Sequence, residues 1–318
     1  MVQDYTLSDL EREIIRACLS VKDFTLGQRA GIKDLGKTVR ESYPDFKGDV
    51  NPASVVTLVD MHNQETILRH LAQHFPDLYI TVEENIEPDK QTAVQKQLYA
   101  NRDNARFLLA FDALDGSSYY KDGTSSNYAV CTSILERTGE DTCRFKLAIF
   151  YYPETGMFLI ARGKNNVVEM DEDGREQSIH VEYKEGGDVT GGAHTFRTFQ
   201  SHELHGDNTL GFRVSKLFKN DGKAMAHDIQ GLLRLERAGY VMKGPKLIDI
   251  GAGAYILDCA GFHVRYEDGS ELGDVMWGDR VSEDGTRHIA ILPDKILIAA
   301  LNSRLYRDLI EQINRNRL

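Results

Sequence analysis

The sequence predicts an α+β fold in which helical and sheet layers alternate. Apolar residues recur at helical spacing near residues 5–21 and 61–75, and a series of short β-rich segments follows them. A polar, glycine-rich stretch then runs from about residue 171 to about residue 210, before helical patterns return. Because 318 residues exceed the roughly 150 of an average domain, we expect two packed lobes, residues 1–172 and 173–318.

The expected elements follow in order along the chain. Leu7, Leu10 and Ile14 indicate the first helix, and the second helix ends where His74 and Phe75 precede a proline. Strands are expected at residues 78–82, 107–111, 128–135, 145–152 and 157–161, separated by Asp, Gly and Pro signals. Beyond the glycine-rich stretch, we expect helices near residues 223–238, 250–260 and 303–315 and a strand near 288–292.

The composition is typical of a globular protein. Apolar residues make up 41% of the chain and charged residues 27%, and no segment approaches the roughly 18 to 20 consecutive apolar residues that span a bilayer. The first residues carry acidic side chains where a secretory signal would carry basic ones. We therefore predict a cytoplasmic protein with no membrane partner.

The net charge limits the class of binding partner. The chain has 38 basic and 49 acidic residues, which gives a formal charge of −11. Binding to a nucleic acid polymer relies on clustered Lys and Arg, so we do not expect that partner. A small phosphorylated substrate remains compatible with the charge if a metal ion supplies the positive charge.

The cysteines and histidines indicate no metal site or disulfide framework. The cysteines are scattered without a CxxC pair, and most stand within apolar patterns, so we interpret them as buried free thiols. We expect neither an HExxH nor an HxxxH pair among the ten histidines, and we do not predict a histidine-ligated zinc ion.

Residues 31–38 match the phosphate-binding pattern GxxxxGK[ST]. Such a loop follows a buried apolar strand and opens a helix. The preceding residues 24–30 are not such a strand, so we interpret 31–38 as a solvated loop and expect no catalytic role for Lys37.

Carboxylates stand where apolar segments end. The segment 107–111 is followed by Asp112 and Asp115, and the segment 78–82 is followed by Glu83 and Glu84. Two further acids occupy similar places: Asp60 closes the β-like run 54–60, and Asp249 precedes a helix start rich in small residues. Clustered buried carboxylates repel one another and cost desolvation energy unless a cation lies between them. The pattern therefore predicts a cation site.

The stretch 112–118 suggests how such a site is built. A sharp turn after the strand would direct Asp112 and Asp115 to a common centre and leave the Leu114 carbonyl as a further ligand; Gly116 permits this turn. The backbone N–H groups of residues 116–118 would then face an anion at the start of a helical turn. Taken alone, the same pattern also fits a helix cap with a solvated carboxylate.

Four motifs in order make the sequence similar to a known family. They are Val56-Thr57-Leu58-Val59-Asp60, the pair Glu83-Glu84, the D-x-x-D-G-S element from Asp112 to Ser117, and the D-x-x-A-G element from Asp249 to Gly253. In these motifs the chain resembles the Mg²⁺-dependent, lithium-sensitive phosphomonoesterases that include inositol monophosphatase, 3'(2'),5'-bisphosphate nucleotidase and fructose-1,6-bisphosphatase. The likeness covers roughly residues 5 to 315 and implies a layered αβαβα sandwich.

The resemblance also implies a site. Its metal ligands would be Glu83, Asp112, the Leu114 carbonyl, Asp115 and Asp249, holding two or three Mg²⁺ ions. Its catalytic residues would be Asp60 and Ser117, which orient the attacking water, with Glu84 beside them. Substrate contacts would come from Gly116, Ser117, Ser118 and Asp249. The family also implies sensitivity to lithium and a homodimer.

The substrate stays open at this point. Ala113 stands where the family usually has Pro, and Ile248 where a Trp usually precedes the late aspartate. The resemblance implies a phosphoric monoester hydrolase like inositol monophosphatase. The alternatives are a bisphosphate nucleotidase, a fructose-1,6-bisphosphatase, or an inactive metal-binding scaffold.

Overall fold

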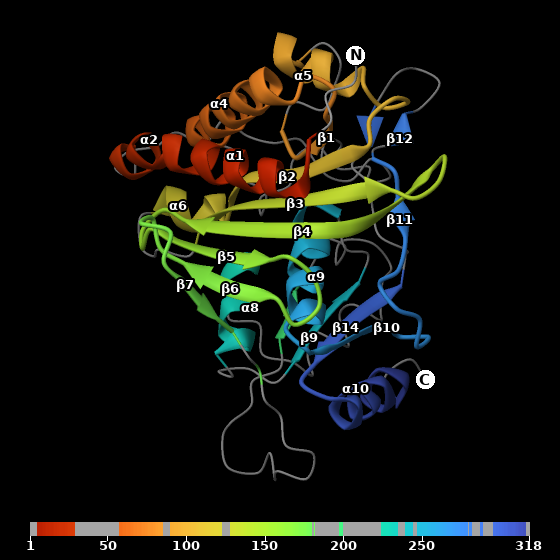
Figure 1. The fold of residues 1–318 in the computed structure, drawn as a ribbon. Coiled ribbons are helices and arrows are strands. Elements are labelled where there is room, and N and C mark those ends of the chain that lie inside the picture. The colour runs from red at the N-terminus through yellow and green to blue at the C-terminus, as the bar shows by residue number, and fades with distance from the viewer. Residues whose placement is uncertain are drawn as a thin grey trace.

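The computed structural model describes residues 5–28, 57–84, 90–122, 128–179, 181, 197–199, 224–234, 239–243, 247–278, 280–281, 287–288 and 295–315. In this part of the chain, helices and sheets form alternating layers (Figure 1). The pattern 31–38 and Lys37 lie outside the described residues.

The first helical layer lies against one face of the large sheet. It contains α1 (Leu7–Ser20), α2 (Lys22–Gly27), α4 (Leu58–His74) and α5 (Ala93–Tyr99). α1 begins at a capping box in which the Thr6 hydroxyl accepts a hydrogen bond from the Asp9 N–H, while the Asp9 carboxylate accepts one from the Thr6 N–H. Leu10 and Ile14 of α1 and Ile67 and Leu71 of α4 are fully buried, so one apolar face of each helix covers the sheet.

Within the described ranges, the large sheet has eight strands. Seven of them lie side by side in chain order: β1 (Tyr79–Val82), β2 (Phe107–Asp115), β3 (Ala129–Arg137), β4 (Thr142–Tyr152), β5 (Met157–Ala161), β6 (Val167–Met170) and β7 (Glu176–Ser178). The eighth, β11 (Val275–Met276), pairs with β4. Only β1 and β2 are parallel among these pairs. The first eight residues of β2 are all buried, which explains its continuous apolar run.

A second helical layer and a smaller sheet lie on the other face. The helical segments are α8 (Met225–Leu233), the π-helical turn Leu247–Gly251 and α9 (Ala252–Cys259). The smaller sheet has the order β10 (His263–Tyr266), β14 (Ile296–Ala300), β9 (Gly239–Lys243) and β8 (Arg197–Phe199). β12 (Arg280–Val281) pairs with β13 (Arg287–His288).

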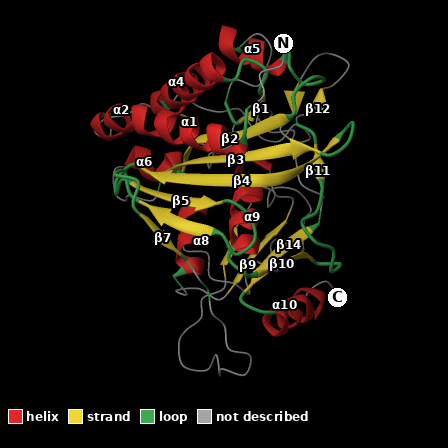
Figure 2. Cartoon of the chain, in the orientation of Figure 1, coloured by secondary structure: helices red, strands yellow, loops and turns green. Residues whose placement is uncertain are grey.

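The last helix completes the layers. α10 (Ser303–Arg315) packs Leu309 and Ile313 against Ile296 and Ile298 of β14. Figure 2 shows helices on both faces of the long strands and α10 beyond the smaller sheet. This arrangement confirms the expected αβαβα sandwich. The division into lobes at residue 172 remains a prediction, and β7 continues the large sheet to residue 178.

The structure corrects several sequence expectations. The second helix begins at Leu58 rather than near residue 61, so Asp60 lies in the first turn of a helix and not at the end of a strand. The reason is that the Thr57 hydroxyl caps the helix by accepting hydrogen bonds from the N–H groups of Val59 and Asp60. Strands β6, β9, β10 and β14 were not expected, because short buried strands and helix segments share the same apolar pattern.

Within the described residues, no helix is both long enough and apolar enough to cross a membrane.

Candidate active site

Asp60 and Ser117 form the centre of the site. The Ser117 hydroxyl oxygen lies 2.5 Å from Asp60 Oδ1 and 2.8 Å from the Leu114 carbonyl oxygen. The other carboxylate oxygen, Oδ2, accepts hydrogen bonds from the Thr57 N–H at 2.7 Å and the Thr57 hydroxyl at 2.6 Å. Asp60 is 2% exposed and Ser117 half-buried, and three further polar groups hold this carboxylate and hydroxyl pair in a fixed orientation.

The carboxyl ends of β1 and β2 place two further acids at one edge of the sheet. The strands are parallel, and Val82 pairs with Phe111. The next residues in the two strands are Glu83 and Asp112. Carboxyl ends of parallel strands meet at the same sheet edge, so the strand register sets these two acids beside each other. That the two acids share a cation site stays a prediction.

A bulge in β2 shapes the next residues. The pairing of β2 with β3 shifts between Asp112 and Asp115, and Asp112 Oδ1 accepts a hydrogen bond from the Leu114 N–H at 2.9 Å. Gly116 follows with a φ of 90°, a conformation that strains most other residues. The short helix α6 (Ser117–Asp122) begins directly afterwards. The expected sharp turn is therefore present and brings the Leu114 carbonyl to Ser117.

Asp115 links this turn to the second helical layer. Its Oδ2 accepts a hydrogen bond from the Ala226 N–H at 2.7 Å, and its Oδ1 accepts one from the Met225 N–H at 3.3 Å. Both donors lie in the first turn of α8, where N–H groups have no intrahelical partner. Asp115 thus caps α8 from the other layer. Each carboxylate oxygen has a second lone pair, so this role leaves capacity for a cation.

The backbone of Glu84 is held by two glutamines. Its carbonyl accepts hydrogen bonds from Gln64 Nε2 at 2.9 Å and Gln95 Nε2 at 3.0 Å, and its N–H donates to Gln64 Oε1 at 3.2 Å. These side chains come from α4 and α5 and fix the end of β1. Glu84 is 7% exposed. Burial and these backbone hydrogen bonds together fix its position beside the site.

The pKa of the Asp60 carboxyl is raised to about 6. Burial is the main cause, and the charge of Glu83 raises the pKa further. The hydrogen bonds from Ser117 and Thr57 oppose the shift because they stabilise the charged form. A carboxylate with a pKa near neutrality is suited to accept a proton during catalysis.

The donor atoms fit a hard cation. Glu83, Asp112 and Asp115 offer carboxylate oxygens and Leu114 a carbonyl oxygen, which is the ligand chemistry of Mg²⁺ or Ca²⁺. A cation among these groups would also offset the repulsion that raises the pKa of Asp60. Two predicted side chains, those of Asp249 and Ser118, lie outside the description. The backbone of Asp249 is on the π-helical turn Leu247–Gly251, which packs on β2.

Two contributors, Gln64 and Gln95, were not singled out in the sequence, and two others, Thr57 and Gly253, were named there only as parts of motifs. Thr57 belongs to a T-x-x-D capping box, which is a recognisable helix start. Gln64 and Gln95 carry no such signal, because their partner is a backbone group that is distant in sequence. Gly253 allows α9 to approach α8: a Cβ atom there would lie 2.9 Å from atoms of both Ile229 and Met225.

Comparisons with known proteins place this geometry in a known fold. An IMPase from Thermotoga maritima superposes with a TM-score of 0.64 at 15% identity, covering 97% of this chain and 98% of the other. An inositol monophosphatase from Zymomonas mobilis gives 0.59 at 17% identity, covering 98% and 100%. The chain has the inositol monophosphatase fold. No family model and no curated protein sequence matches it.

A third structure with the inositol monophosphatase fold carries ligands. It is an IMPase/NADP phosphatase solved in complex with Mg²⁺ and phosphate, with a TM-score of 0.63 at 14% identity and coverage of 98% of this chain and 97% of that one. At such low identity the likeness establishes the fold, and the chemistry has to be argued from this chain's own residues.

Proposed function

We propose that this chain is a phosphoric monoester hydrolase that uses Mg²⁺ to cleave a small phosphate monoester. One observation carries the proposal: the buried carboxylate of Asp60 lies 2.5 Å from the hydroxyl of the half-buried Ser117, beside the acidic end of β1 and β2. A surface helix cap would not need a buried carboxylate held by three separate donors.

The metal ligands would be Glu83, Asp112, the Leu114 carbonyl, Asp115 and Asp249. Mg²⁺ bound by them would neutralise the phosphate charge and lower the pKa of a water molecule. Glu84 would lie beside these ligands, at the end of β1, where Gln64 and Gln95 hold its backbone.

Asp60 and Ser117 would move the proton. The Ser117 oxygen accepts the proton of the attacking water as its own proton passes to Asp60 Oδ1. The water oxygen forms the new bond to phosphorus and the bond between phosphorus and the ester oxygen breaks. The departing oxygen takes a proton from solvent water and leaves as the alcohol, and Asp60 afterwards returns its proton to solvent. The backbone N–H groups of residues 116–118, at the start of α6, would bind the phosphate oxygens.

A phosphate-release assay tests the proposal. The purified chain is incubated with Mg²⁺ and a panel of inositol phosphates, phosphoadenosine phosphate, sugar bisphosphates and NADP. NADP is included because one structure with this fold was solved with that molecule. We expect release from at least one compound, lost on chelation and lost in Asp112→Asn. Asp308→Asn, an exposed acid on α10, is the matched control and should retain activity.

The panel also separates the alternatives. Preference for phosphoadenosine phosphate would identify a bisphosphate nucleotidase, and preference for a sugar bisphosphate a fructose-1,6-bisphosphatase type of enzyme. Mg²⁺ binding without hydrolysis of any compound would favour the inactive scaffold. The cytoplasmic location, the lithium sensitivity and the homodimer stay predictions.

A further inference from the structure

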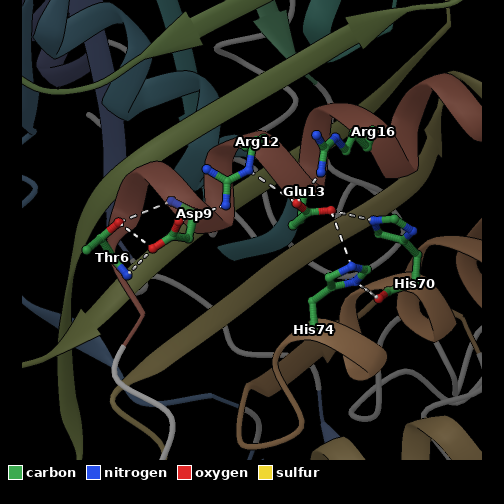
Figure 3. A network of polar contacts seen from close by, with 7 residues as sticks. All are labelled: Thr6, Asp9, Arg12, Glu13, Arg16, His70 and His74. Atoms are coloured by element: carbon green, nitrogen blue, oxygen red, sulfur yellow. Dashed lines mark hydrogen bonds and ion pairs between the residues drawn. The ribbon is translucent and has the colours of Figure 1, made fainter.

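A second group of potential ligands lies between α1 and α4. It consists of Glu13 of α1 and His70 and His74 of α4, whose ligand atoms all lie within 4.8 Å of one another (Figure 3). His70 and His74 stand four residues apart, so both rings lie on one face of α4, with ring centroids 4.6 Å apart. The expectation that the histidines form no HxxxH pair is therefore wrong, because His70 and His74 have this spacing.

The atomic distances suit a tetrahedral metal ion. His70 Nε2 lies 3.0 Å and His74 Nε2 3.7 Å from Glu13 Oε2. With metal–ligand bonds of about 2.0 to 2.1 Å, neighbouring ligands of a tetrahedral Zn²⁺ lie about 3.3 Å apart, so the two observed distances lie on either side of that value. At 3.7 Å, His74 and Glu13 are too far apart for a good hydrogen bond.

The ring of His74 is oriented as in known metal sites. His74 Nδ1 lies 2.9 Å from the His70 carbonyl oxygen. A carbonyl only accepts hydrogen bonds, so Nδ1 carries the proton, and the lone pair of the neutral ring is on Nε2, facing Glu13. Metal-binding histidines commonly donate their second N–H in this way, which fixes both the tautomer and the ring orientation.

The local charge is compatible with a dication. Glu13 Oε1 accepts hydrogen bonds from Arg16 at 2.7 Å and Arg12 at 3.3 Å, whereas Oε2 faces the histidines. Arg12 is also paired with Asp9 at 2.7 Å. The two arginines bind Asp9 and the Glu13 oxygen that the histidines do not use, which leaves Oε2 available to a cation. The Glu13 side chain is 5% exposed and that of His74 42%, so the site is anchored inside and open to water on one side.

We propose that Glu13, His70 and His74 bind a Zn²⁺ ion, with water as the fourth ligand, and that this ion joins α1 to α4. Mixed imidazole and carboxylate ligands suit Zn²⁺ far better than Mg²⁺. The site is separate from the one at Asp60. His70 follows Asp60 by ten residues on the same helix, which corresponds to about 15 Å along its axis.

Zinc titration of the full chain tests the proposal. Excess Mg²⁺ is present so that the oxygen ligands near Asp60 are occupied. We expect the wild type to bind one Zn²⁺ at micromolar protein concentration, and binding to weaken at least tenfold in His70→Gln, His74→Gln and Glu13→Gln. His263→Gln, a half-buried histidine on β10, is the matched control and should bind Zn²⁺ like the wild type.

A second measurement needs no substitution. The side-chain nitrogen resonances of His70 and His74 should shift on addition of Zn²⁺ to the wild type, while those of His263 should not. Zinc should also raise the melting temperature of the wild type and leave that of His74→Gln unchanged. No bound zinc in the wild type, or equal affinity in all variants, would overturn the proposal. So would loss of the zinc in Asp112→Asn with retention in His74→Gln.

Discussion

The hydroxyl oxygen of Ser117 lies 2.5 Å from Oδ1 of Asp60, although 57 residues separate the two in the chain. Ser117 begins α6 after the turn at Gly116, and Asp60 lies in the first turn of α4. Two helix starts therefore meet at the carboxyl end of β2. Their side chains can act as one unit because the positions of both are fixed by the backbone.

Ser117→Ala should remove most of the activity without unfolding the protein. The variant loses the group that relays the proton to Asp60, and general base catalysis of this kind contributes about 10² to 10⁴ in rate. Turnover at saturating Mg²⁺ and the melting temperature are the measurements. Ser117→Thr keeps the hydroxyl and is the matched variant. If Ser117→Ala and Ser117→Thr were equally active, the relay would be wrong.

Asp112→Asn and Asp115→Asn should differ in their effect on stability. Asp112 is proposed to touch each metal ion, so its substitution should cost several kcal/mol of transition-state stabilisation, at about 1.4 kcal/mol per tenfold in rate. Asp115 also accepts hydrogen bonds from two N–H groups of α8, one at each carboxylate oxygen, and the Asn amide keeps only one acceptor oxygen. Asp115→Asn should therefore in addition lower the free energy of unfolding by about 1 kcal/mol. Activity of Asp112→Asn within tenfold of the wild type would argue against the bridging role.

Thr57→Val should lower both stability and activity. The hydroxyl caps α4 and donates to Asp60, and loss of such a cap costs about 0.5 to 2 kcal/mol. Thr6→Val removes the equivalent hydroxyl from the capping box of α1, away from the site. We expect the Thr6 variant to lose stability alone. Equal turnover in the two variants would show that Thr57 only starts a helix.

Gly253→Ala should destabilise the packing of α9 on α8. The added methyl group would lie 2.9 Å from Ile229 and Met225, and overpacking of a core costs about 1 to 3 kcal/mol. Gly27→Ala is the control, because nothing lies within 4 Å of that position. It should stabilise the protein by about 0.4 to 1 kcal/mol. Chemical denaturation measures both changes, and the same sign for both would contradict the close approach of the two helices.

Local patterns predicted the elements of residues 1–172 well and those of residues 173–318 less completely. The segments 107–111 and 78–82 are apolar runs followed by acids, so both the strands and the acidic edge could be anticipated. Strands β9 and β14 could not, because each is a short apolar run whose pairing joins residues 239–243 to 296–300. The contacts of Gln64 and Gln95 with Glu84 could not be predicted for a similar reason. A side chain that binds a backbone group distant in sequence produces no recognisable sequence pattern.

Asp249→Asn tests whether the second helical layer completes the metal site. The π-helical turn that carries Asp249 packs on β2, and its neighbours Leu247 and Ile248 are buried, which brings this backbone beside the strand of Asp112. If Asp249 and Asp115 hold the more weakly bound ion, the variant should need more Mg²⁺ for activity. It should also respond differently to lithium, which prefers the same hard oxygen ligands. Binding of the more tightly held ion, through Glu83 and Asp112, should change little.

Asp258→Asn, nine residues further along on α9, is the control and should keep the Mg²⁺ dependence of the wild type. Turnover is measured against Mg²⁺ with and without lithium for all three proteins. An unchanged Mg²⁺ dependence in Asp249→Asn would leave Asp249 with a structural role only. The other proposed ligands, Glu83, Asp112, the Leu114 carbonyl and Asp115, would then have to hold the ions by themselves.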